Sequence, residues 1–208
     1  MTEKEPVPGR VTPRPTAAAI VRLWGASLGR RLPPGRPAPG LRHSAATRQL
    51  VLVLAGTEVV TAFVISSMLP PALRVVHAVT ELLMILAGLG LVASLLRHPH
   101  MVDDAHVVLR TGFLGEVALP RAAVRSAAPV VRTVPGRGPR PVPGEPGAVA
   151  CSVEAAVNVA LHLDPPVRLD LGRAGRVDAA TVYLSADSPS AFAAALSVSL
   201  RARSAPGR

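Results

Sequence analysis

The chain has 208 residues, of which 49% are hydrophobic and only 17% charged, together with 22 prolines and 17 glycines. This composition indicates apolar helices combined with irregular and soluble segments. The net charge of +10 lies mainly in the terminal segments, and the chain has only five aromatic residues. Both facts argue against a nucleic-acid-binding module, because such modules carry basic charge on a folded face beside stacking aromatics. The single cysteine, Cys151, excludes an intrachain disulfide.

The N-terminal segment, residues 1–48, is predicted to be a disordered basic tail. The first 49 residues carry a net charge of +7, and residues 1–15 and 32–40 are rich in proline, glycine and charge. Between them, residues 16–31 place Ile20, Leu23, Trp24 and Leu28 at helical spacing. Two interpretations stand for these residues, a short amphipathic helix on an anionic membrane surface or a loosely structured basic tail.

Residues 49–97 are predicted to form a transmembrane hairpin. Two apolar runs, Leu50 to Leu69 and Val75 to Leu96, are each long enough for a span of roughly 20 residues, and Pro70-Pro71 separates them. Arginines lie before the first run and after the second, whereas Arg74 alone lies in the turn between them. The positive-inside rule therefore predicts a multi-pass protein of the plasma membrane with both termini in the cytoplasm.

Three ionisable residues within the predicted spans form a candidate intramembrane polar seam, namely Glu58, His77 and Glu81. Helical rise puts Glu58 near the bilayer midplane and Glu81 roughly 9 Å from the outer end of its run. An acid inside a span is normally paired, protonated or turned towards protein. The seam is interpreted either as an assembly or proton-sensitive element, or as neutral side chains that fix the packing of the two helices.

A cluster of histidines and aspartates follows the second run. His98, His100, Asp103, Asp104 and His106 are residue types that ligate metals. Their spacing matches no established site, and Asp103-Asp104 also suits a turn before a strand. A structural junction is the preferred interpretation, and no metal or cofactor is predicted.

From residue 98 the pattern is that of half-buried strands with alternating apolar residues. The segment Pro135 to Gly147 is predicted to be a mobile loop, and Asp164-Pro165-Pro166 a hairpin turn. Asp187-Ser188-Pro189 then begins a final helix, with Phe192, Leu196 and Leu200 on one face. The predicted strands are 106–111, 115–119, 122–133, 149–154, 157–163, 167–171 and 177–185.

These motifs carry a family resemblance over roughly residues 50–200. The motifs are Arg97-His98-Pro99-His100, Leu109-Arg110-Thr111-Gly112, Val117-Ala118-Leu119-Pro120, Asn158-Val159, and Leu184-Ser185-Ala186-Asp187-Ser188-Pro189 with Phe192. The chain resembles uncharacterised bacterial integral membrane proteins with a two-helix hairpin and a C-terminal PH-like domain. The resemblance implies an α+β membrane protein in which residues 98–202 form a PH-like antiparallel β-barrel with a C-terminal helix, followed by a tail, 203–208. It implies no catalytic residues.

The turn after the first predicted strand of this domain offers a possible contact loop. Phe113 and Leu114 are expected either to dip into the membrane or touch a partner, or to fold back onto the barrel. The stretch from Arg110 to Glu116 holds one arginine, so a phosphoinositide pocket is not supported.

No recognisable nucleophile, metal or phosphate-binding set appears, so the chain is not expected to be an enzyme. The leading hypothesis is a membrane-anchored interaction module on the cytoplasmic face, which binds a protein partner or its own copies. A second hypothesis is a small assembly subunit of a larger membrane complex that uses the Glu58/Glu81 seam. A weaker third hypothesis is a metal-dependent enzyme that uses His98, His100 and His106.

Overall fold

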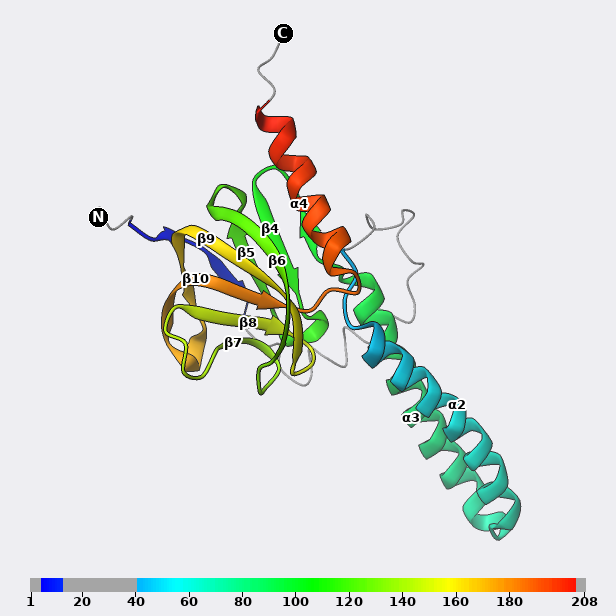
Figure 1. Ribbon diagram of the computed structural model, residues 1–208. Helices are drawn as coiled ribbons and strands as arrows, with labels where there is room; N and C mark the ends of the chain where they lie inside the picture. Colours follow the sequence, from blue (N-terminus) through cyan, green and yellow to red (C-terminus); the bar gives the residue numbers. More distant parts are fainter. Residues whose placement is uncertain (1–4, 13–40, 205–208) are drawn as a thin grey trace.

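A helical hairpin projects from one end of a β-rich domain (Figure 1). The computed structural model describes residues 5–12 and 41–204, apart from the side chains of residues 113 and 198–204. The hairpin helices are α2 (Ala45–Met68) and α3 (Pro71–Arg97), and both are long and apolar enough to cross a membrane. Pro71 occupies the first turn of α3, where a missing N–H costs nothing. The guanidinium of Arg74 donates to the carbonyl of Leu69 at 3.0 Å and closes the turn.

Aliphatic side chains are exposed along the distal part of the hairpin, except where α2 and α3 face each other. The exposed stretches run from Leu50 to Met68 and from Pro71 to Leu89. At 1.5 Å per residue each is about 28 Å long, which matches the hydrocarbon thickness of a bilayer. Beyond Leu89, α3 becomes buried against the β-rich domain, with Leu95 only 2% exposed. The hairpin therefore divides into a lipid-compatible part and a part docked on protein.

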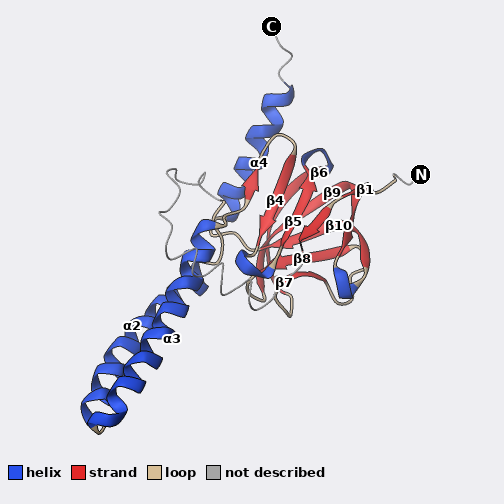
Figure 2. Cartoon of the chain, turned by 180° about the vertical axis from the view of Figure 1, so that it is seen from behind, coloured by secondary structure: helices blue, strands red, loops and turns tan. Residues whose placement is uncertain are grey.

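The β-rich domain consists of two sheets and a C-terminal helix, α4 (Pro189–Ser204). Figure 2 shows the strands packed together with α4 beside them, directed away from the hairpin. One sheet has the order β1-β9-β10-β8-β7, with β6 also paired to β9, and the other has the order β2-β5-β4-β3. The strands are β1 (Val7–Pro8), β2 (Arg10–Thr12), β3 (Met101–Val102), β4 (His106–Arg110), β5 (Glu116–Pro120), β6 (Val124–Thr133), β7 (Gly138–Pro141), β8 (Ala148–Ser152), β9 (Ala156–Asp170) and β10 (Arg176–Leu184).

The core lies between the two sheets and under α4. Val107, Leu109 and Leu119 from one sheet and Leu161 and Val182 from the other are fully buried there. Phe192 and Leu196 of α4 close the same cluster, as their four-residue spacing predicts. The alternation that identified these strands therefore reports the inner face of a two-layer structure.

The pairing of the strands corrects the predicted antiparallel barrel. Within the described residues the strands form two sheets, not one closed barrel, and β8 runs parallel to β10. The reason is that β10 folds back on β9 and inserts between β9 and β8. Period-two alternation reveals which face of a strand is buried but not which strand lies beside it.

Two proline-rich segments also differ from expectation. The predicted turn at Asp164-Pro165-Pro166 is the middle of one long strand, β9. Pairing of β9 with β6 ends at Leu163, pairing with β1 begins at Val167, and β10 is irregular here, so no neighbour needs the missing proline N–H groups. The predicted mobile loop contains β7, an edge strand paired with β8, where prolines are also tolerated.

Residues 1–48 do not behave as a uniform tail where they are described. Residues 7–8 pair with β9 and residues 10–12 pair with β5. Leu41, His43 and Ser44 are buried at the base of the hairpin, and α2 begins at Ala45. Such short strands and short buried segments contain too few residues to show a hydrophobic periodicity, so the sequence does not reveal them. The amphipathic segment weighed for residues 16–31 lies outside the described residues.

Candidate functional site

The hairpin brings the three residues of the polar seam together. Glu58 lies ten residues before Met68 at the end of α2, and Glu81 lies ten residues after Pro71 at the start of α3. Both are therefore about 15 Å from the tip, at the same level. The distance of roughly 9 Å predicted for Glu81 was counted from Val75, whereas α3 begins at Pro71.

The carboxyl groups of Glu58 and Glu81 lie close enough to each other to interact across the hairpin. The Nδ1 atom of His77 lies 3.5 Å from Glu81 Oε1, one turn along α3. Among the described residues, His77 Nε2 and Glu81 Oε2 are buried without a hydrogen-bond partner. The seam is thus an internal contact between the two helices that leaves two polar atoms unsatisfied.

The base of the hairpin is joined to the two-layer β-rich domain, here called the sandwich, by hydrogen bonds to the first turn of α2. The backbone N–H of Ala45 donates to Asp187 Oδ1 at 2.8 Å, and that of Thr47 donates to Glu154 Oε1 at 3.2 Å. Arg48 forms an ion pair with Asp187 Oδ2 at 2.7 Å. The first N–H groups of a helix lack partners within the helix and favour negative charge. Asp187, which was expected at the start of the final helix, therefore caps α2, 142 residues away in sequence.

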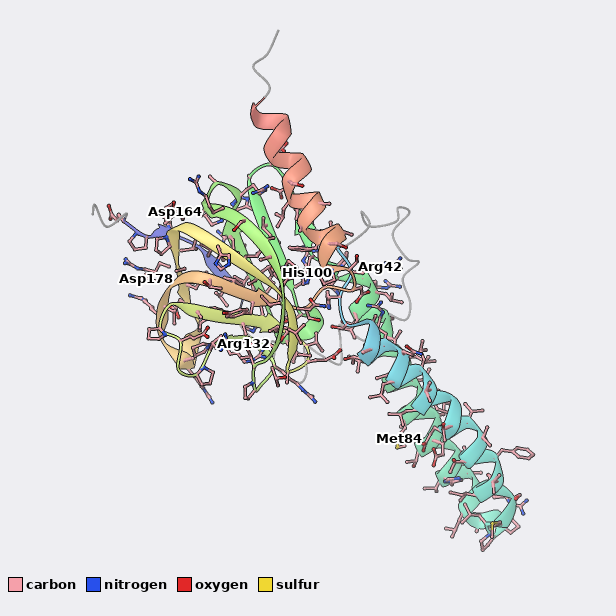
Figure 3. The ribbon with its side chains drawn as sticks, viewed as in Figure 1. Arg42, Met84, His100, Arg132, Asp164 and Asp178 are labelled. Carbon is pink, nitrogen blue, oxygen red and sulfur yellow. The ribbon has the colours of Figure 1, made fainter. Side chains whose placement is uncertain are left out.

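Two buried histidines stack beside this capped turn. The rings of His43 and His100 are 4.7 Å apart, and Phe192 meets His100 edge-on at 5.8 Å. His100 accepts the backbone N–H of Arg110 at Nδ1 and donates from Nε2 to the carbonyl of Ser185, both at 3.0 Å. Figure 3 places His100 between the sandwich and the start of the hairpin.

The environment keeps both imidazoles neutral. Burial lowers the pKa of His100 to about 3, and the neighbouring His43 contributes in the same direction. Burial also lowers the pKa of His43, although a backbone hydrogen bond with His98 and the charge of Asp187 oppose that shift. The pair is therefore adapted to hold the junction together in the uncharged form.

The histidines and aspartates that were weighed as a metal site do not converge. Both ring nitrogens of His100 bind backbone groups, and His98 Nδ1 lies 2.8 Å from the carbonyl of Ser94. Across residues 5–12 and 41–204, no group of three metal-ligating side chains converges. Asp103 instead accepts the backbone N–H groups of Ala105 and His106, as expected for a turn before a strand. His98, His100 and His106 are parts of the junction and of the turn beside it.

The loop proposed as a contact loop instead packs against the base of the hairpin. The short helix η1 (Gly112–Leu114) packs on the end of α3, where Leu114 is 4% exposed and clusters with Leu95 and Val153. Gly112 has a left-handed φ of 61°, and a Cβ there would lie 3.1 Å from Leu95. Leu114 is therefore not available to a membrane or a partner, whereas the side chain of Phe113 lies outside the described ones.

Sequence reasoning missed the capping of α2 by Asp187 and Glu154. No local signal identifies it, because the donors and acceptors lie more than 100 residues apart. The left-handed backbone conformation of Ser44, just before α2, is also not indicated by any sequence pattern.

Comparison with protein-family models, with curated proteins and with solved structures finds no match to this chain.

Proposed function

We propose that the chain is a membrane-anchored, non-enzymatic interaction module. The hairpin spans the plasma membrane with both termini in the cytoplasm, and it holds a PH-like domain at the cytoplasmic surface. There the domain binds a protein partner or a second copy of the chain. The observation that carries the proposal is the hydrogen-bonded junction, in which the sandwich itself caps the first turn of α2.

A rigid connection between the hairpin and the sandwich would help recognition at a membrane. The junction uses contacts of three kinds: the carboxylates that cap α2, the stacked pair His43 and His100, and the apolar docking of Leu95 on Leu114. Together they prevent the domain from swinging freely on its anchor. A partner at the membrane then meets a surface whose orientation is already set, which lowers the entropic cost of binding.

The arrangement of the strands supports a PH-like fold at the level of architecture. Two packed sheets with a C-terminal helix against the core agree with that class, although the parallel pair β8 and β10 departs from the antiparallel pattern expected. On either side of the turn between β4 and β5, Arg110 forms an ion pair with Glu116 at 3.2 Å. This pairing argues against a phosphoinositide pocket there.

A second candidate function rests on the polar seam. His77 Nε2 and Glu81 Oε2 lack hydrogen-bond partners among the described residues, and such atoms are costly in hydrocarbon. In an assembly subunit, a polar group from another membrane helix would reach these atoms after a small rearrangement. The hairpin, not the sandwich, would then be the contact surface.

Site-specific photocrosslinking in the living membrane distinguishes the two candidates. A photoreactive residue is placed at Val131 or Arg176, both exposed on the sandwich, and at Phe63, which is 78% exposed on the hairpin. The interaction module predicts discrete protein adducts from the sandwich positions and lipid adducts from Phe63. Protein adducts from Phe63 alone would support the assembly subunit, and their absence at all three positions would remove both candidates.

A further inference from the structure

A short N-terminal segment bridges the two sheets on the side of the domain remote from the hairpin (Figure 1). Val7 and Pro8 pair in parallel with Val167 and Arg168 of β9. Residues 10–12 then pair antiparallel with residues 116–118 of β5. We call these acceptor residues of β5 and β9 the strand-pairing site. One extended octapeptide thus completes an edge of each sheet.

The fit at the crossing point is specific for glycine. The N–H of Gly9 donates to the carbonyl of Arg168 at 2.9 Å. A Cβ at Gly9 would lie 2.6 Å from side-chain atoms of both Val167 and Leu169, and 3.3 Å from the carbonyl of Ala118. These distances leave no room for any larger residue without movement of core side chains.

The strand-pairing site requires an occupant. Val117, Val167 and Leu169 are fully buried, and Val11 packs on the same core. Without the segment, β5 and the second half of β9 would present unpaired backbone groups beside aliphatic side chains. Such an edge recruits another strand.

The occupant is tied to the site by a long piece of chain. Residues 13–40 separate it from Leu41, which is buried at the base of the hairpin. These 28 residues have a maximal span of about 95 Å. The site recognises main-chain groups, two aliphatic side chains and a glycine, and all of these are identical in every copy of the chain.

We propose that the strand-pairing site takes the N-terminal segment of a second copy, so that neighbouring chains exchange residues 5–12 reciprocally. This inference rests on the proposed function and names the partner as the chain itself. The membrane anchor presents the site of every copy at the same height and in the same orientation, which favours exchange between neighbours.

Disulfide trapping between two differently tagged full-length copies tests the exchange. One copy carries Thr12→Cys and the other Glu116→Cys, since these residues are direct partners across the β2 and β5 pair. The native Cys151 does not compete, because it is fully buried and burial raises the pKa of its thiol to about 12. The matched control pairs Thr12→Cys with Val131→Cys, which is exposed on β6.

Exchange predicts a disulfide between the two tagged copies in membranes, no such bond in the control pair, and loss of the bond when Gly9→Val is added to the Thr12→Cys copy. A chain that carries both cysteines provides the intramolecular reference. A disulfide that forms only within that chain, and never between copies, would overturn the exchange. That outcome would leave crosslinks from Val131 or Arg176 to other proteins unaffected, so the proposed function would survive it.

Discussion

The hairpin and the sandwich use the same aliphatic residues in opposite ways. Val60 of α2 is 65% exposed, whereas Val182 of β10 is completely buried. Water disfavours such residues unless they are covered, so the sandwich buries them in a core, while the hairpin exposes them on two helices long and apolar enough to cross a membrane. The comparison separates a part of the chain that covers its apolar residues from a part that leaves them exposed, with the junction between the two parts.

The largest contrast is expected from removing the same aromatic ring in each region. Phe192→Ala empties a fully buried site under α4 and should lower the free energy of unfolding by about 3–5 kcal/mol. Phe63→Ala removes a ring that is 78% exposed on the hairpin and should leave the stability of the sandwich unchanged. Urea unfolding in nanodiscs, followed by circular dichroism, measures both. Equal losses would contradict the division into two regions.

A charge introduced at an exposed valine sharpens the comparison. Val60→Arg places a guanidinium near the middle of the hairpin and should disfavour insertion by about 3 kcal/mol. Val131→Arg, at a fully exposed position of β6, should have no effect. The fraction of protein that resists alkaline extraction from membranes reports insertion. Unchanged extraction of the Val60 variant would show that this face does not meet lipid.

Lowering the pH should destabilise the junction around His100 before it destabilises the rest of the sandwich or the hairpin. The unfolded chain binds a proton on histidine below pH 6.5, whereas buried His100 resists protonation down to a pKa of about 3. Stability is therefore lost as the pH falls, by about 2 kcal/mol between pH 7.5 and 5 for this residue. Asp187 opposes the shift at His43, and Arg48, Arg110 and His98 bear on the same pair.

The pH dependence of the urea midpoint measures this effect. His100→Gln should flatten it, and His162→Gln, at an exposed position of β9, should leave it unchanged. A slope that persists in the His100 variant would assign the effect to other groups.

The smallest effect is expected at the cap of α2. Asp187→Ala removes the acceptor of the Ala45 N–H and the partner of Arg48, and should cost about 1–2 kcal/mol. Asp178→Ala breaks an ion pair with Arg168 whose side chains are half exposed, and should change stability little. Limited proteolysis at the junction adds a direct readout. Equal behaviour of the two variants would remove Asp187 from the account.

The sequence correctly predicted those features that recur at regular spacing within a single helix or strand. The two apolar runs, the strand faces and the spacing of Phe192 and Leu196 were visible because each element buries or exposes residues at a fixed period. Pairing partners were not visible, so the parallel pair β8 and β10 and the long strand β9 were missed. The prolines in β7 and β9 gave the wrong signal, because each lies where no neighbour needs an N–H.

The sequence identified residues of the candidate site but not the contacts that these residues make. Glu58, His77 and Glu81 were recognised because ionisable groups are rare in apolar runs, and the structure brings them into contact. The role of His100 depends on the backbone groups of Arg110 and Ser185, which no spacing reveals. Contacts between distant segments decide the junction, and local patterns carry no information on them.

Accessibility of single cysteines in intact cells tests the central claim most directly. Arg74→Cys lies at the hairpin tip and Arg137→Cys lies in the sandwich, while the native Cys151 is buried and unreactive. A membrane-impermeant maleimide is applied before and after permeabilisation. The account predicts that position 74 is labelled from outside and that position 137 is labelled only after permeabilisation. Labelling of position 137 in intact cells would contradict it.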